Sequence, residues 1–454
     1  MKNPLNSIQE SFRRGFEKAG KDSDAEERRI GAELKFPLVV DPDGTASARE
    51  QLTEIWTLLQ KKGWEPDIDT LTGSISGACK PGERNNTVAS FETGYCKPEF
   101  SLAHVGSLSD LDGSIESLRE ELEECADSTD SCLIGYGIQP VTPPSADLMM
   151  KKERSSVWDK AVPSNTIIPE TEGDDVALFT VNAASHVHIS VSEQEAVKAV
   201  NVLNGFAGAQ IALMADSSVW KGDADSGYMC AAEKFWDWWE PSKQRSGIPL
   251  TPFCDIEDYI QRIMGLAPIY IKRDGKPLIP QGYASFLDYY SEERARTVDL
   301  EGKPVQTAPE PADVDLHNSC YWYTARISRY YTVENRACDQ QPPEDLIAPA
   351  ALTLGLVSVL DEAWEELNRY DWSTLRDLRE AACRNGLKGS ADGLEAAALS
   401  ALMLELAETG LSRRNQNEER FLAPLKERSE CPAREAEDLF RNGGAEGLVN
   451  SRRI

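Results

Sequence analysis

Apolar and polar residues follow two different periods along this chain. Ile8, Phe12 and Phe16 fall on one stripe of a helix, whereas residues 29–40 alternate residue by residue, as half-buried strands do. A turn signal, Asp41-Pro-Asp-Gly44, ends that alternation. The same reasoning predicts helices over 5–20, 46–62, 112–127 and 193–213, and strands over 29–40, 74–80, 87–92, 99–102, 132–141 and 178–192.

The rest of the chain divides into a middle and a C-terminal region. Residues 214–320 are loop-rich and hold an aromatic cluster, Phe235–Trp239, whereas the chain from residue 344 onwards is mostly helical. The expected fold class is therefore α+β, with mostly antiparallel strands followed by helices. We expect one α+β unit over 1–343, with 214–320 as its insert, and a helical region over 344–454 packed on the same unit.

The net charge of −28 narrows the classes of partner. Such a charge disfavours binding to nucleic acid and to anionic membrane surfaces, both of which need clustered Lys and Arg. The sequence has no run of about eighteen apolar residues, so no membrane span is expected. The first twenty residues lack the apolar segment of a secretory signal, and a cytoplasmic location is the resulting expectation.

Several common sites have no signature in the sequence. The ten cysteines form no C-x-x-C pair, which argues against zinc-ribbon and thioredoxin-like sites, and we expect them to remain thiols. Neither G-x-G-x-x-G nor a Walker lysine motif occurs, so Rossmann and P-loop folds are not indicated.

An acid and an arginine stand two residues apart on a strand-like stretch. Glu334 and Arg336 share a face there, because side chains alternate along a strand. Together they suit a metal-bound phosphate, with the carboxylate on the cation and the guanidinium on the oxygens. A structural ion pair on a half-exposed sheet is the other interpretation.

Other predicted strands carry residues of the same kind. Glu33 lies on the first strand, Glu92 and Glu99 bracket a link that is either hairpin-like or a bulge, and His186 and His188 share a face. Carboxylate oxygens are the preferred ligands of Mg²⁺, and a neutral imidazole can serve as one more. Each residue alone is more often a surface acid or a satisfied histidine. Acids inside strands are costly unless paired or metal-bound, so their joint occurrence favours a metal site.

In their order along the chain, these segments resemble the glutamate–cysteine ligase superfamily, and within it the plant-type and bacterial carboxylate–amine ligase branch. The resemblance extends over nearly the whole chain, as far as Leu411-Ser-Arg-Arg414 and Cys431-Pro-Ala-Arg434. It implies a glutamine-synthetase-like fold, in which an antiparallel sheet curls into a funnel with helices outside. The motifs that carry it are Gly31-x-Glu33, Glu92 with Glu99, Leu133-Ile-Gly-Tyr-Gly-Ile-Gln-Pro140, His186-Val-His-Ile-Ser190 and Thr332-Val-Glu-Asn-Arg-Ala-Cys-Asp339.

The resemblance also implies an activity and its site. Members activate the γ-carboxylate of glutamate with ATP as γ-glutamyl phosphate and pass it to an amine, usually that of cysteine. Arg336 and Arg326 would clamp the transferring phosphoryl group, and Arg336 with Lys35 would bind the cofactor. Phosphoryl transfer mainly needs such positioning and charge neutralisation. The implied ligands of Mg²⁺, or of Mn²⁺ in its place, are Glu33, Glu92, Glu99, His188 and Glu334.

The implied partners are small molecules: glutamate, cysteine or another amine, and ATP. The protein would act as a monomer or homodimer. The acyl phosphate needs shielding from water, and region 214–320 could supply a lid or a substrate wall. Ordinary packing is the other role for its tryptophans.

Two positions depart from the family pattern. Lys35 stands where a second acid usually follows Glu33, so it could replace one cation by its own charge or abolish one metal site. Ala232 stands where an arginine is usual, and Lys234 is the candidate to compensate. These departures keep two alternatives open: ligation of glutamate to another amine, and a ligand-binding paralogue with impaired turnover.

Overall fold

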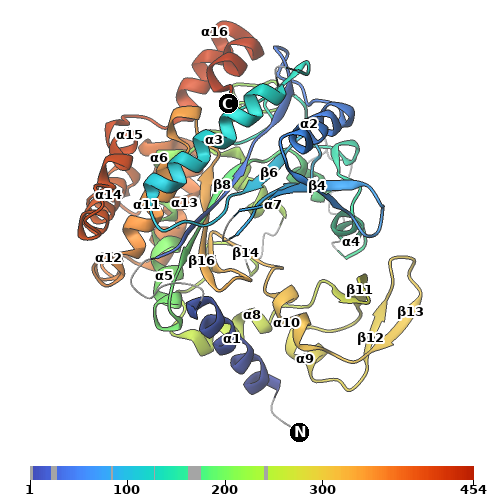
Figure 1. The fold of residues 1–454 in the computed structure, drawn as a ribbon. Helices are drawn as coiled ribbons and strands as arrows, with labels where there is room; N and C mark the ends of the chain where they lie inside the picture. The colour runs from blue at the N-terminus through green and yellow to red at the C-terminus, as the bar shows by residue number, and fades with distance from the viewer. Residues whose placement is uncertain (1–3, 22–27, 83–84, 127, 162–174, 240–243) are drawn as a thin grey trace.

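An antiparallel sheet of eight strands organises the protein (Figure 1). The computed structural model describes residues 4–21, 28–82, 85–126, 128–161, 175–239 and 244–454. All neighbouring strands of this sheet run antiparallel. In spatial order the strands are β15 (Ala325–Ile327), β16 (Thr332–Asp339), β8 (Ala184–Ser190), β1 (Ile30–Lys35), β6 (Pro98–Ser101), β5 (Thr87–Phe91), β4 (Ile75–Lys80) and β3 (Glu65–Ile68).

Helices cover one face of the sheet. Helices α5 (Glu193–Gly205), α6 (Ala207–Met214) and α11 (Ala348–Val357) pack on the β15-to-β1 half. Helix α2 (Arg49–Lys61) packs on β3 and β4, and α3 (Leu108–Ala126) packs against α2 and β1. On this face Asn335 donates hydrogen bonds from Nδ2 to Gln210 Oε1 on α6 (2.6 Å) and to Thr353 Oγ1 on α11 (2.8 Å). Because strand side chains alternate, the neighbours of these buried residues point to the opposite face.

Strand β1 shows this alternation clearly. Ile30, Ala32 and Leu34 belong to the hydrophobic core, whereas the side chains of Glu33 and Lys35 project to the other face. The helix-covered face therefore stabilises the fold and leaves the second face for polar residues.

A second, four-stranded antiparallel sheet lies apart from the main one (lower right in Figure 1). Its strands are β10 (Ile271–Arg273), β11 (Lys276–Pro280), β12 (Ala295–Val298) and β13 (Pro304–Thr307). Region 214–320 was predicted only as loop-rich, and this sheet was not predicted, because strands of three to five residues give too short an alternation to recognise. The described part of this region also holds α7 (Ala231–Trp239), β9 (Ser246–Gly247), α8 (Ile256–Met264), α9 (Phe286–Tyr290) and α10 (Pro311–His317).

Two predicted strands are shorter than expected. The segment 29–40 is interrupted at Pro37, which lacks the N–H needed for a continuous ladder, and continues as β2 (Leu38–Val40). The segment 132–141 forms only β7 (Ser131–Leu133) and then isolated bridges. Its Gly137 has a packing reason: a Cβ there would lie 2.6 Å from Asp339 Cγ.

Two further boundaries were wrong. The β run expected over 178–192 begins only at Ala184, because Asp175–Thr180 form a 3₁₀ turn. The single helix expected over 193–213 is two helices, α5 and α6, which meet at Phe206. The helices expected over 5–20, 46–62 and 112–127 are confirmed as α1 (Pro4–Lys21), α2 and α3, although residue 127 lies outside the described residues.

The C-terminal region is helical, as predicted. It contains α11, α12 (Leu360–Leu367), α13 (Trp372–Asn385), α14 (Ala396–Arg413), α15 (Ala423–Glu427) and α16 (Pro432–Arg452), with a short hairpin of β17 (Ser390–Ala391) and β18 (Leu394–Glu395). One buried cluster includes residues from both sides of residue 343. The division of the chain at that point stays a prediction.

Two sequence-based expectations about the whole chain can be compared with the structure. All ten cysteines are free thiols, as expected. Among the described residues, no single helix has both the length and the apolar character to cross a membrane, and only the pair Pro343–Val357 and Leu360–Leu367, bent by 87°, passes that test together.

Candidate active site

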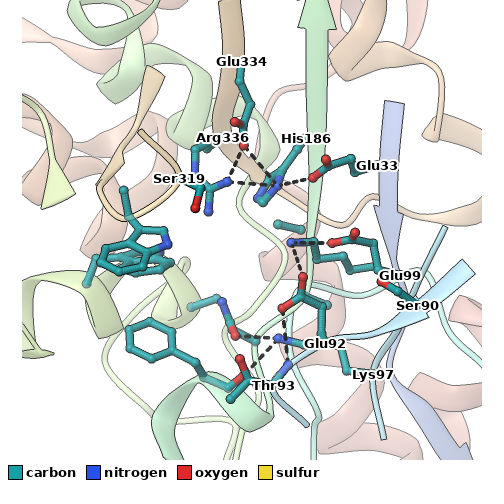
Figure 2. A pocket seen from close by; sticks show the side chains of 18 of the residues that line it. Glu33, Ser90, Glu92, Thr93, Lys97, Glu99, His186, Ser319, Glu334 and Arg336 are labelled. Atoms are coloured by element: carbon teal, nitrogen blue, oxygen red, sulfur yellow. Dashed lines mark hydrogen bonds and ion pairs between the residues drawn. The ribbon is translucent and has the colours of Figure 1, made fainter. Parts of the chain in front are cut away.

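A cavity of about 300 Å³ lies on the polar face of the sheet. Its walls come from the strands β1, β5, β6, β8, β15 and β16 of the main sheet and from neighbouring segments (Figure 2). The eight residues predicted to bind the metal, the cofactor or the phosphoryl group all line this one cavity: Glu33, Lys35, Glu92, Glu99, His188, Arg326, Glu334 and Arg336.

Strand register explains how residues so far apart in sequence meet. Residues directly opposite one another on neighbouring strands have Cβ atoms roughly 5 Å apart. The site is a row of such pairs across five strands: Arg326 with Glu334, Glu334 with His188, His186 with Glu33, and Lys35 with Glu99. Glu92 follows β5 directly, and the link from Glu92 to Glu99 joins two antiparallel strands, so the hairpin-like alternative is the correct one.

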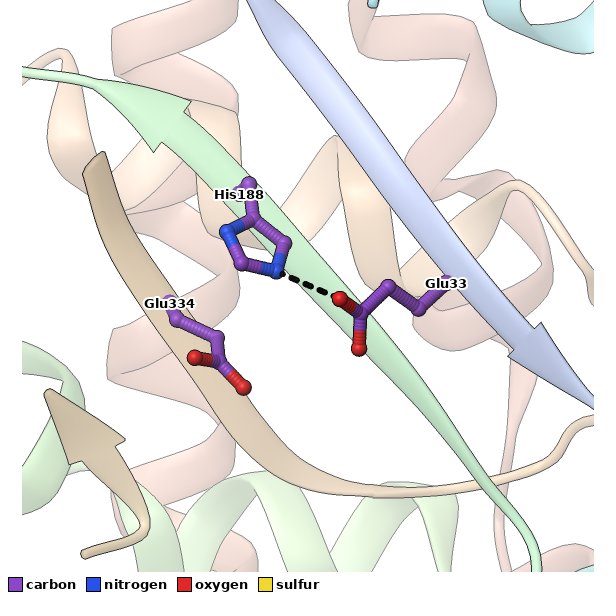
Figure 3. Close-up of side chains that lie close together, drawn as sticks. All are labelled: Glu33, His188 and Glu334. Atoms are coloured by element: carbon purple, nitrogen blue, oxygen red, sulfur yellow. Dashed lines mark hydrogen bonds and ion pairs between the residues drawn. The ribbon is translucent and has the colours of Figure 1, made fainter. Parts of the chain in front are cut away.

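Glu33, His188 and Glu334 form the tightest group of metal-ligating side chains in the described part of the chain (Figure 3). One ligand atom from each lies within 4.8 Å of the others. His188 Nε2 is 3.2 Å from Glu33 Oε1, and its Nδ1 is 2.9 Å from Thr332 Oγ1, which fixes the ring. Two carboxylates and an imidazole at this spacing fit a hard divalent ion such as Mg²⁺.

Glu334 is held by both arginines. Arg326 Nε donates to Glu334 Oε2 at 2.8 Å, and Arg336 Nη1 donates to Glu334 Oε1. Burial acts to raise the pKa of Glu334, but the two guanidiniums outweigh it and hold this pKa well below its usual range. The Glu334 carboxylate is therefore ionised at neutral pH.

Arg336 lies at an irregularity of β16. The pairing of β16 with β8 shifts register between Asn335 and Cys338, as β-bulges near active sites often do. Its guanidinium lies 5.9 Å from the centre of the Trp236 ring. Within the described residues the Arg336 guanidinium makes its ion pair and hydrogen bonds through Nη1, so its Nη2 and Nε can bind an anion.

Glu33 is surrounded by imidazoles. His186 Nδ1 lies 3.1 Å from Glu33 Oε2, opposite the contact with His188. Burial acts to raise the pKa of Glu33, but the hydrogen bonds with His186 and His188 hold it well below its usual range. Burial and the nearby Arg336 lower the pKa of His186 to about 3, so this ring is neutral.

Lys35 lies in the other half of the cavity, between two carboxylates. Its Nζ is 2.9 Å from Glu99 Oε2 and 3.2 Å from Glu92 Oε1. Burial acts to lower the pKa of Lys35, yet Glu92 and Glu99 outweigh it and raise the pKa above its usual value. Lys35 is thus a permanent cation.

Four basic residues of the cavity were missed by the sequence reasoning: Lys97, Lys152, Arg154 and Arg329. Lys97 Nζ donates to Phe179 O (3.0 Å) and Asn182 Oδ1 (2.9 Å), and burial lowers its pKa to about 8 although Glu92 opposes this. Lys152 and Arg154 also line the cavity, from the segment at the start of α4 (Glu153–Ala161). Only Lys97 had a signal, namely its position between Glu92 and Glu99.

Aromatic rings form one wall of the cavity. Trp236 on α7 stacks on Trp322 of β14 (Trp322–Tyr323), with ring centres 5.7 Å apart, and Trp239 meets the same ring edge-on. Trp236 and Trp239, which belong to region 214–320, line the cavity together with Trp322, so ordinary packing is not the whole role of these two rings.

The cavity wall has no positive charge at Ala232, the position where an arginine was expected. Ala232 lines the cavity, but Lys234 pairs with Asp237 at 2.8 Å and with Glu380 on α13. The prediction that Lys234 compensates for Ala232 was therefore wrong.

The sequence matches Glutamate-cysteine ligase family 2 (GCS2) over residues 29–451, and the chain belongs to this family. This family consists of ligases that join carbon to nitrogen. No curated protein matches the chain.

Two solved structures share the fold at low sequence identity. A bifunctional glutathione synthetase from Pasteurella multocida is 10% identical, with a TM-score of 0.51, and the match covers 96% of this chain but only 52% of that protein. The glutamate–cysteine ligase (gshA) from Francisella tularensis, solved in complex with AMP, is 11% identical, with a TM-score of 0.50, and the match covers 94% of this chain and 87% of that one. This chain thus spans about half the length of the Pasteurella protein.

Proposed function

We propose that the protein uses ATP and Mg²⁺ to convert the γ-carboxylate of L-glutamate to γ-glutamyl phosphate, which then acylates the amine of L-cysteine. The observation that carries this proposal is the convergence of Glu33, His188 and Glu334 with Arg326 and Arg336 in one cavity. In this proposal the sheet is the curled funnel of the glutamine-synthetase-like fold.

The chemistry divides into two displacements. An oxygen of the glutamate γ-carboxylate attacks the terminal phosphorus of ATP and ADP leaves. The acceptor amine then attacks the acyl carbon, loses a proton, and inorganic phosphate leaves. Mg²⁺, held by Glu33, His188 and Glu334, would neutralise phosphate charge. Arg336 and Arg326 would bind the transferred phosphoryl oxygens, where fixed guanidiniums lower the barrier.

The tryptophan wall would exclude water from the acyl phosphate, which hydrolyses if it is exposed. Within this wall Trp236 lies between Trp322 and the Arg336 guanidinium, so it also limits how far that arginine can move. The wall thus supports both positioning and protection of the intermediate.

A coupled assay of ADP release tests the proposal. The protein is incubated with ATP, Mg²⁺ and glutamate, and with each of a panel of amino acids and amines. ADP release that depends on cysteine, together with γ-glutamylcysteine in the product, is the expected result. ATP binding without ADP release for any amine would overturn the proposal in favour of an impaired paralogue.

A different acceptor amine is the second candidate. The cavity wall contains Trp236, Trp239 and Trp322, a larger apolar surface than the small side chain of cysteine requires. Release of ADP with an aromatic or bulky amine, and not with cysteine, would favour this function.

A further inference from the structure

The cavity contains two pairs of carboxylates with different partners. On one side Glu33 and Glu334 lie around His188, with a spacing that fits a divalent ion. On the other side Glu92 and Glu99 lie around the ammonium group of Lys35. The two halves therefore offer different sites for positive charge.

Lys35 occupies the space between its two partners. An Nζ atom 2.9 Å and 3.2 Å from two carboxylate oxygens fills the position that a cation bridging them would take. A divalent ion there would need both oxygens at roughly 2.0–2.6 Å and would lie against a like charge. Glu92 is further neutralised by Lys97 and Lys152, which lie close to it.

The backbone keeps Lys35 in this position. Lys35 lies opposite Glu99 in the pairing of β1 with β6, and its carbonyl oxygen accepts a hydrogen bond of 3.0 Å from Gln340 Nε2. Its side chain is only 10% exposed, so it has little room to swing into solvent. The ammonium cannot be removed by chelators, as a metal ion can.

Resting on the function proposed above, we propose that the cavity takes a single divalent cation, held by Glu33, His188 and Glu334, and that the Lys35 ammonium is a built-in second cation between Glu92 and Glu99. Glu92 and Glu99 then leave the set of metal ligands predicted from the sequence. The Lys35 ammonium supplies one fixed positive charge, which is present whatever the metal concentration.

Binding of Mn²⁺, measured by the loss of the free-ion electron paramagnetic resonance signal, tests this stoichiometry without turnover. The full-length protein is titrated with Mn²⁺ alone and with Mn²⁺ plus a non-hydrolysable ATP analogue. We expect one Mn²⁺ per chain in the wild type with the analogue, and two in Lys35→Glu, since that substitution replaces the ammonium by a third carboxylate. Lys198→Glu, an equal charge change at a solvent-exposed ion pair between α5 and Asp361 of α12, serves as the control and should bind one.

Variants that keep Lys35 provide a second measurement, in case Lys35→Glu does not fold. Glu334→Gln should weaken Mn²⁺ binding by at least about tenfold, because second-shell changes alone already cost that much. Glu99→Gln should change the Mn²⁺ affinity by less than about threefold, since a non-ligand has only a distant effect.

Several results would overturn the inference. In the wild type, either two tightly bound Mn²⁺ ions or none would do so. One ion in a folded Lys35→Glu variant would also do so, as would a loss of Mn²⁺ affinity in Glu99→Gln as large as that in Glu334→Gln. A wild type that binds one Mn²⁺ but releases no ADP would contradict the proposed function and leave the metal assignment standing.

Discussion

Replacing Glu334 by Gln removes the charge that both site arginines share. The Glu334 side chain is 2% exposed and its Oε2 lies 2.8 Å from Arg326 Nε. At an effective dielectric constant of about 20, a charge pair at that distance attracts by about 6 kcal/mol. Removing one partner of a buried pair costs about 3–5 kcal/mol, because the other charge stays buried without compensation.

In free-energy terms, Glu334→Gln should cost more in catalysis than in folding stability. Because Gln keeps one acceptor oxygen, we expect the free energy of unfolding to fall by about 3 kcal/mol. The same change removes a metal ligand and loosens Arg336, and losing a single preorganised charge contact costs about 100- to 1000-fold in rate. We therefore expect Glu334→Gln to lower kcat/KM for ADP release by at least about 1000-fold, which corresponds to about 4 kcal/mol.

The two losses are measured separately. Urea unfolding followed by tryptophan fluorescence gives stability, and the coupled assay is run under conditions in which the variant is folded. Glu344→Gln, an exposed glutamate outside the cavity, is the matched control and should behave as wild type. A folded Glu334→Gln variant with activity within about tenfold of the control would refute the assigned role.

Three other predictions concern stability. Arg379 is 3% exposed and pairs with two acids on α7, so Arg379→Met should lower the free energy of unfolding by about 3–5 kcal/mol. Arg384 is 48% exposed, so Arg384→Met should lower it by less than about 1 kcal/mol. Equal urea midpoints for the two variants would contradict this. Gly94→Ala should lower the unfolding temperature markedly, because its Cβ would lie 2.0 Å from Thr180 O, and an unchanged temperature would show that the loop adjusts. Burial lowers the pKa of His317 to about 3, below its ordinary 6.5, so the unfolded chain binds the extra proton and stability falls as pH drops from 6.5 towards 3. At pH 4.5 this amounts to about 2–3 kcal/mol. Between about pH 7.5 and 4.5, His317→Gln should therefore lose less stability than the wild type by about that amount, and an equal loss in the two proteins would contradict this assignment.

The sequence predicted the faces of the strands better than their partners. Alternation placed Glu33 with Lys35, and Glu334 with Arg336, on shared faces, and the structure agrees. It could not predict that Lys35 would lie opposite Glu99, because register depends on pairing between strands that are far apart in sequence.

Residues outside the long strands were harder to find. Lys152 enters the cavity from the segment just before α4, and its position depends on tertiary packing alone. The small sheet β10–β13 was missed because prolines at positions 277 and 280 resemble loop signals in so short a strand. In both cases the local pattern carries too little information to place the segment.

The alternation along β1 limits how this protein can change. Deleting one residue before Glu33 within that strand would turn the carboxylate and ammonium groups towards the helices and expose Leu34 to the solvent side. Folding and chemistry would then be lost in the same event. New specificities can consequently arise here by exchange of side chains at fixed positions, while changes of length are tolerated only in the links between strands.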